Sequence, residues 1–146
     1  MKNLADYIKQ RIASNAAAAA TTTVNGNVID TLGFHGAMVS VHLGDVASGS
    51  VLGLKLQGSD SSDSTTMADI SGASITSQTA DATSADNKLL ELDVYRHGKR
   101  YVMPVLTRGT ATATLNSMIV TLYGPRVEPT TTHSDTLTRT TINPPG

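Results

Sequence analysis

Histidines and clustered aspartates are the side chains of this sequence best suited to metal binding or acid–base chemistry. Both need short, regular spacings, because several such groups must reach one ion or substrate. Asp60 and Asp63 in GSDSSDS suggest a calcium loop, but the twelfth position counted from Asp60 is Ser71, where an EF-hand has glutamate. The four histidines are His35, His42, His97 and His133. They lie far apart, without the H-x-x-x-H or H-E-x-x-H spacing of zinc sites, so we predict no metal site and no cofactor.

Motifs of covalent and phosphate chemistry are absent from the sequence. There is no cysteine, which excludes a disulfide scaffold and thiolate metal ligands. The chain has no G-x-S-x-G nucleophile turn, no P-loop and no dinucleotide fingerprint, and no glycine cluster leads into a recognisable helix. No catalytic residue can be assigned, and we expect a protein without enzymatic activity.

The strongest concentration of functional side chains is basic and aromatic. Its members are Tyr95, Arg96, Lys99, Arg100, Tyr101 and Arg108. Such a pattern is typical of single-stranded nucleic-acid binding, but arginine and tyrosine are also enriched at the energetic centres of protein interfaces. A net charge of −1 gives no overall attraction to nucleic acid or to an anionic membrane. We favour a protein interface; a solvated hairpin and a nucleic-acid site are the alternatives.

The chain has the size of one domain and an unusual composition. Its 146 residues include 21 Thr, 14 Ser and 16 Ala, but only one Phe and no Trp. Charged residues make up 16% of the chain, against roughly 25% in an average soluble domain. No apolar run reaches the ~18 residues that a membrane helix needs. We therefore expect a thin core of Leu, Val and Ile that leans on partner subunits for part of its stability.

Residues 1–22 form the first of two predicted arms. Charged residues interrupt its apolar positions, so it lacks the ~7–15-residue apolar run of an export signal. Leu4, Ile8 and Ile12 recur every four residues and alanines follow, which favours a helix from about Asn3 to Ala20. A helix with so narrow an apolar stripe is marginal alone in water. We therefore expect this arm, helical or extended, to dock on a partner through its three apolar residues; a frayed terminus is the alternative.

Residues 23–125 have the pattern of an all-β domain. Alternation of apolar and polar residues predicts half-buried strands at 37–43 and 51–57. Their inward positions are Ala37, Val39, Val41 and Leu43 in the first and Leu52, Leu54 and Leu56 in the second. Further strands are predicted at residues 67–70, 73–78, 88–96, 99–106, 110–116 and 118–123, with a weak strand at 27–32. Some seven or eight core strands in about 100 residues predict an antiparallel β-sandwich or jelly roll.

Two of these strands are predicted to pair as a hairpin that carries the basic and aromatic residues. Leu90, Leu92 and Val94 alternate with polar residues, and His97-Gly98 supplies a turn before the next strand begins. Pro104 falls inside the second strand. Since proline cannot donate a ladder hydrogen bond, it predicts an edge strand or a bulge there.

Residues 126–146 form the second predicted arm. Four of the five prolines lie from Pro125 onward, and threonine dominates the stretch TTTHSDTLTRTT. Proline removes backbone donors and threonine favours extended backbone. We expect an extended arm with little core of its own, and Arg126 at its start as a further contact residue.

The small net charge conceals an uneven distribution. Residues 1–12 carry +2, residues 13–87 carry −6 and residues 88–146 carry +3. Faces of opposite sign would suit head-to-tail contacts between neighbouring copies. Solvated loops are the alternative, because aspartate is common in turns.

Three stretches together resemble small structural proteins of tailed bacteriophages. They are LQGSDSSDSTTMADISG, then KLLELDVYRHGKRYVMPVLTRGTATA, then a last strand ending in YGPR. The resemblance extends over roughly residues 50 to 130 and lies in the order of the features: a strand into a Ser-Asp-rich loop, a basic tyrosine-bearing hairpin, and a strand that exits into a Thr-rich tail.

The resemblance implies a capsid decoration (cement) protein. Such proteins are often jelly-roll homotrimers that stand on the outside of the head and clamp neighbouring copies of the major capsid protein with extended arms. It implies that residues 88–108 form a core and edge hairpin, with residues 1–22 and 126–146 as the arms, in a virion protein made in the bacterial host cytoplasm. A head–tail connector or tail protein is one alternative. A carbohydrate-binding β-sandwich module is another, although the chain lacks the tryptophan that sugar platforms normally use.

Overall fold

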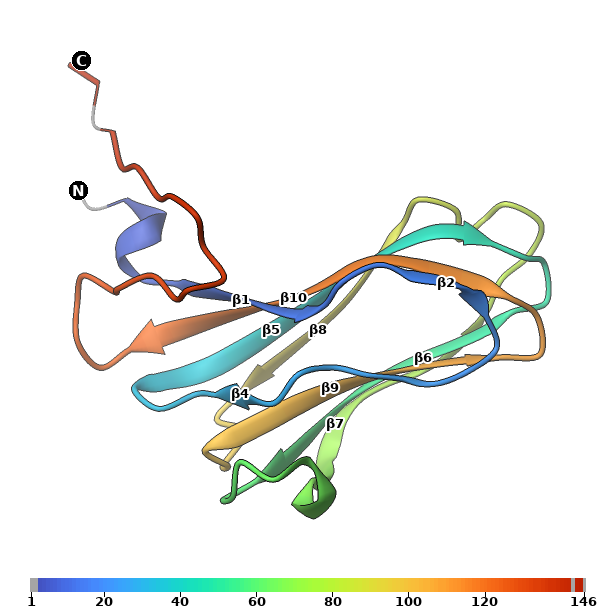
Figure 1. The fold of residues 1–146 in the computed structure, drawn as a ribbon, viewed down its shortest axis with the longest axis horizontal. Coiled ribbons are helices and arrows are strands. Elements are labelled where there is room, and N and C mark those ends of the chain that lie inside the picture. The colour runs from blue at the N-terminus through green and yellow to red at the C-terminus, as the bar shows by residue number, and fades with distance from the viewer. Residues whose placement is uncertain (1–2, 143, 146) are drawn as a thin grey trace.

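The computed structural model describes residues 3–142 together with 144 and 145. Two antiparallel sheets face each other as a sandwich, and both termini extend from one end of it (Figure 1). Two short 3-10 turns accompany the strands, η1 (Leu4–Asp6) and η2 (Ser64–Thr66). The strands in chain order are β1 (Lys9–Ser14), β2 (Ala17–Ala20), β3 (Val24–Asn25), β4 (Ile29–Asp30), β5 (Phe34–Val46), β6 (Val51–Ser59), β7 (Ala68–Thr79), β8 (Leu89–Tyr95), β9 (Tyr101–Gly109) and β10 (Ala113–Pro125).

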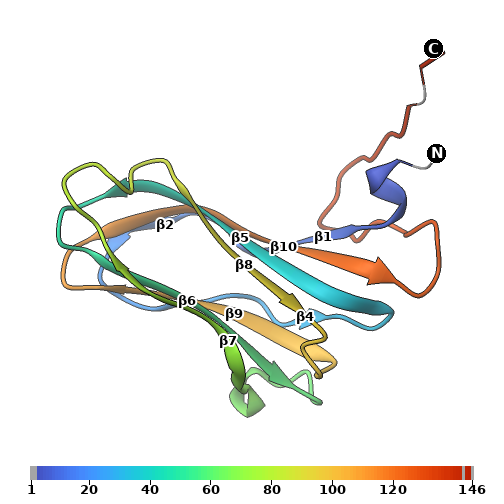
Figure 2. The ribbon, with the colours of Figure 1, turned by 180° about the vertical axis from the view of Figure 1, so that it is seen from behind.

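The strand order is that of a jelly roll. One sheet has the order β1–β10–β5–β8, with β2 also beside β10, and the other has the order β3–β9–β6–β7, with β4 also beside β9. Early strands pair with late ones: β1 with β10, β4 with β9, β5 with β8 and β6 with β7. The chain is therefore a long hairpin wrapped into two facing sheets, as the view from behind also shows (Figure 2). This confirms the predicted all-β antiparallel sandwich.

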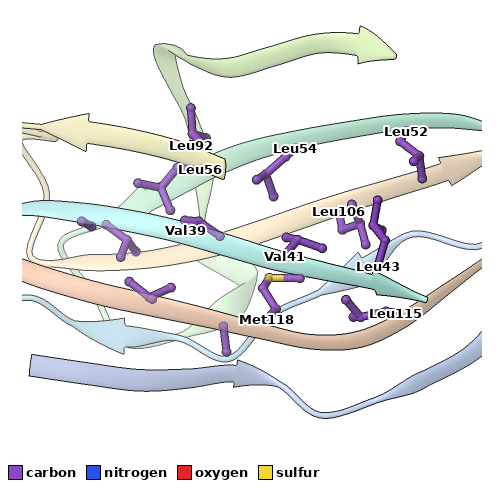
Figure 3. Packing of buried hydrophobic residues seen from close by; sticks show 14 of the residues in the cluster. Val39, Val41, Leu43, Leu52, Leu54, Leu56, Leu92, Leu106, Leu115 and Met118 are labelled. Atoms are coloured by element: carbon purple, nitrogen blue, oxygen red, sulfur yellow. The ribbon is translucent and has the colours of Figure 1, made fainter. Parts of the chain in front are cut away.

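The core lies between the two sheets and is almost entirely aliphatic (Figure 3). All seven predicted inward positions of β5 and β6 are confirmed, since none is more than 3% exposed. Leu106, Leu115 and Met118 meet them from β9 and β10 (Figure 3). Burying one such side chain contributes roughly 1.5–3 kcal/mol.

The predicted helix from Asn3 to Ala20 is wrong. Its helical part is limited to η1, and residues 9–14 and 17–20 are strands paired with β10. Ala13 is 1% exposed and belongs to the core. Alanine's helix propensity exceeds that of most residues by less than about 1 kcal/mol each. Pairing with β10 instead satisfies a row of backbone groups at an otherwise open sheet edge. Residues 9–14 and 17–20, which were predicted to belong to an arm, therefore form one edge of the sandwich.

The predicted hairpin is also wrong, because its two strands lie in different sheets. β8 pairs with β5, β9 pairs with β6, and residues 96–100 cross from one sheet to the other. Arg96 and Gly98 reverse the chain with φ values of 55° and 77°. Alternation of apolar and polar residues shows which side of a strand is buried. It does not show whether the next strand along the chain lies beside it in the same sheet or opposite it across the core.

Pro104 lies inside a sheet, so the predicted edge position is wrong, whereas the pairing beside it is irregular and gains one residue between Asn25 and Ile29. β9 has β6 on one side and β3 and β4 on the other. The oxygen of Pro104 accepts from the Gly26 N–H at 2.8 Å, and Gly26 lies where the neighbouring strand is interrupted between β3 and β4. In antiparallel pairing the N and O of one residue face the same neighbour. The N–H that proline lacks would therefore face the interruption between β3 and β4, and the sheet continues past Pro104.

The segment after β10 is extended, as predicted, but it is tied to the beginning of the chain. The Thr130 hydroxyl lies 2.9 Å from Ala5 O and 2.6 Å from Ile8 O. Arg139 Nη1 donates to Ala5 O at 2.7 Å. Asp135 Oδ2 accepts from the Ile12 N–H and from Arg11 Nε, both at 3.0 Å. We call residues 3–8 and 127–142 together the terminal unit.

Candidate functional site

An open depression lies at the end of the sandwich from which the terminal unit extends. Residues 31–35, 96–100 and Arg126 line it and enclose a volume of about 440 Å³. β5 and β9 begin at this end, and β8 and β10 finish there, at the left of Figure 1. Four cationic side chains contribute to the lining, so we call it the basic depression: Arg96, Lys99, Arg100 and Arg126.

Backbone hydrogen bonds hold the three lining segments together. The Arg96 N–H donates to His35 O and the Arg126 N–H donates to Gly33 O, each at 2.8 Å. The Thr31 N–H and hydroxyl both donate to Arg100 O, at 2.8 and 2.7 Å. The basic side chains are thus mounted on a backbone that the fold has already ordered.

Two of the four cations are held by carboxylates. Arg100 donates through Nε and Nη2 to the two carboxylate oxygens of Asp30, at 3.1 and 2.9 Å. These hydrogen bonds raise the pKa of Arg100 and lower that of Asp30. Lys99 Nζ lies 2.8 Å from Asp60 Oδ2. Within the described residues, Arg96 and Arg126 have no such ion pair.

Tyrosine rings beside the depression contact other aromatic or cationic side chains. Tyr95 is stacked with Tyr123 at 6.3 Å between centroids, and Arg96 lies 5.3 Å from the Tyr95 ring. Burial, together with a 2.6 Å hydrogen bond to Asp93, raises the pKa of Tyr123 to about 12. Arg100 lies 5.0 Å from the ring of Tyr101.

His97 is a buried part of the depression. It is 9% exposed, and neither ring nitrogen has a hydrogen-bond partner among the residues that the structure describes. Burial lowers the pKa of His97, and the backbone of Lys99 opposes this only in part. The folded protein therefore holds this imidazole neutral at pH values where an exposed histidine is protonated.

Replacing His97 with leucine should make the stability of the protein less sensitive to acid. Unfolded His97 binds a proton below about pH 6.5, whereas the folded side chain does so only at lower pH. The free energy of unfolding of the natural chain should therefore fall as the pH drops below that value. In H97L, the part of this fall in the free energy of unfolding that comes from His97 should disappear. Chemical denaturation between pH 7.5 and 5 measures the change. His42→Asn, at an exposed position, is the control and should keep the slope; equal slopes in H97L and the natural chain would contradict the assignment.

Arg108, predicted as a contact residue, lies inside the fold at the far end of β9. It is 5% exposed, and burial lowers its pKa. Its guanidinium donates to Thr22 O, Ala18 O and Ala113 O at 2.9, 2.8 and 2.7 Å. Arg108 thus fastens the segment between β2 and β3 to the body of the sandwich.

The other predicted contact residues divide into two groups. Tyr95, Arg96, Lys99, Arg100, Tyr101 and Arg126 all lie on or beside the basic depression. Leu4, Ile8 and Ile12 do not share a helix face, since they lie on η1, just before β1 and on β1. Leu32 and Phe34 join the depression although no sequence signal marked them, and His97, which the sequence placed only in a turn, joins it too.

The described residues contain no group of three or more His, Asp or Glu side chains placed to hold a metal ion. In the same part of the chain, no helix has the length and apolar character needed to cross a bilayer. No protein-family model matches the sequence, and no curated protein is significantly similar to it.

Proposed function

We propose that this protein is a non-enzymatic virion structural protein that binds the outside of a tailed-phage capsid and reinforces the lattice of the major capsid protein. In this proposal several copies act together, as a homotrimer, so that weak contacts at each copy sum to firm attachment. The terminal unit and the basic depression provide those contacts.

One observation carries the proposal: exposed apolar side chains gather at the end with the basic depression. Of the eight exposed large hydrophobic residues in the part of the chain that the structure describes, six lie on the terminal unit or at the depression: Leu4, Leu32, Tyr95, Val127, Leu137 and Ile142. Leu137 is fully exposed and Ile142 is 71% exposed. This concentration of exposed apolar side chains on the terminal unit and the adjoining end of the sandwich favours contact with another protein.

The alternative functions receive less support from the same surface. A sugar site needs an open aromatic platform, and Tyr95 and Tyr101 are each partly covered by an arginine, Tyr95 also by Tyr123.

A head–tail connector or tail role would use the same docking end, and imaging of the virion distinguishes that role from decoration of the shell. Copies spread over the shell support decoration, whereas a single ring at the neck or tail contradicts it.

Capsid binding should depend on the apolar residues of the terminal unit. We expect L137S/I142S to fold normally, because both side chains are exposed, but to bind expanded heads lacking the protein at least about tenfold more weakly. Leu89→Ser is the matched control, since Leu89 is 60% exposed at the start of β8, at the opposite end. The measurement is cosedimentation with heads, followed by their resistance to heat and osmotic shock. Failure of the natural protein to bind or stabilise heads would overturn the proposal.

A further inference from the structure

The basic depression contains two guanidinium groups free to take a ligand. Arg100 and Lys99 are held by Asp30 and Asp60, but Arg96 and Arg126 have no carboxylate partner within the described residues. Arg96 lies over Tyr95, and a guanidinium above a ring still presents its in-plane N–H donors. Such planar donors fit the two oxygens of a carboxylate or the oxygens of a phosphate.

The walls of the depression are ordered before any ligand arrives. Backbone hydrogen bonds join residues 31–35 to residues 96–100 and to Arg126. His97, nine-tenths buried with both ring nitrogens unpartnered, lies in the same wall. Binding therefore requires little new ordering of the backbone, which favours affinity.

Apolar side chains share the depression with the cations. Leu32 is 63% exposed and Phe34 is half-buried, and both also line an adjoining hollow that Val127 and Pro129 complete. A bare inorganic anion would leave these groups in water. A peptide with an acidic residue beside an apolar one would cover both kinds of surface.

Nucleic acid fits the same surface less well. Base stacking needs free aromatic faces, but an arginine lies over the ring of Tyr95 and another lies over the ring of Tyr101. The carboxylates of Asp30 and Asp60 neutralise two of the four cations, which leaves little positive charge to track a chain of phosphates.

We propose that the basic depression binds the carboxylate of an acidic, partly apolar segment of a partner protein, with Arg96 and Arg126 as its ligands. The proposal rests on the proposed function only for the identity of the partner, a capsid subunit. The site itself stands on the unpaired arginines, the ordered walls and the apolar lining. Arg100 and Lys99 keep their own carboxylates, so the two unpaired guanidinium groups supply the attraction for the ligand.

The test is an NMR titration of the full chain with a blocked hexapeptide that has two adjacent glutamates flanked by leucines. We expect saturable shifts at residues 31–35 and 96–100 with a dissociation constant of about 1 mM. The same peptide with glutamines in place of glutamates should bind about tenfold more weakly. R96Q/R126Q should lose about tenfold in affinity while keeping the amide spectrum of the fold, and Lys88→Gln, outside the depression, should bind like the natural chain.

Three results would overturn the proposal. The glutamine peptide could bind as tightly as the acidic one, the double variant could bind unchanged, or inorganic phosphate or a thymidine oligonucleotide could bind at the same residues more tightly than the peptide. Capsid heads take no part in this titration. Peptide binding without head binding would therefore contradict the proposed function alone, and head binding without peptide binding would contradict this site alone.

Discussion

Replacing Arg108 with methionine should lower the free energy of unfolding by about 2–4 kcal/mol. Methionine keeps much of the aliphatic packing, but it leaves Thr22 O, Ala18 O and Ala113 O without the donors that now reach them. Unsatisfied carbonyl oxygens near the core cost more than the net gain of a typical hydrogen bond. Equilibrium unfolding in urea measures the loss.

Arg126→Met is the matched control, because it makes the same chemical change at an exposed position. It should alter stability by no more than about 0.5 kcal/mol. Hydrogen exchange adds a local readout: in R108M, amides of residues 17–23 should exchange faster, because their link to β9 is lost. Equal stability of R108M and R126M would show that the guanidinium of Arg108 does not support the fold.

Replacing Gly26 with alanine should lower the free energy of unfolding by about 2–3 kcal/mol. A Cβ at Gly26 would lie 2.8 Å from Pro104 Cγ and 2.9 Å from Pro104 O. One of these atoms belongs to the backbone and the other to a rigid ring, so neither can move aside by a change of rotamer. The 2.8 Å hydrogen bond from Gly26 to Pro104 should break as the two segments separate. Thermal and urea unfolding measure the effect.

Gly109→Ala is the control, since the nearest atom to its added Cβ is 3.9 Å away. That change should be neutral or slightly stabilising, because glycine in a strand carries an entropic cost of about 0.5–1 kcal/mol. Adding Pro104→Ala to G26A removes the ring carbons and should recover part of the loss. Strict additivity of the two substitutions would contradict a direct clash between these residues.

The inward faces of the central strands could be predicted from sequence because they depend only on local alternation. Val39, Val41 and Leu54 point inward whichever strands lie beside them. The neighbours of a strand could not be predicted in this way, because no local pattern distinguishes pairing of β8 with β9 from pairing of β8 with β5. The same limit explains the wrong prediction at the N-terminus. The alanines there favour a helix by intrinsic propensity, and they form a strand only because the open edge of β10 pairs with them.

The candidate site shows the same division. Tyr95, Arg96 and Lys99 come to one end because they are close in sequence around one connection, so their clustering needed no tertiary information. Arg108 is in phase with Val102 and Leu106, and alternation carried through β9 would have placed it inside. The burial of His97 depends on segments remote in sequence, and no pattern near it predicts this.

Pairing of the first strand with the last also governs when the protein can fold. β1 has no sheet partner until β10 has been synthesised. Residues 5–12 lack their hydrogen bonds to the side chains of Thr130, Asp135 and Arg139 until those residues follow β10. Contacts so distant in sequence form slowly, because the loop must close before they contribute. During synthesis the sandwich closes only after β10 has left the ribosome. The end that carries the basic depression and the terminal unit is therefore completed last, and a chain shortened before β10 cannot form it.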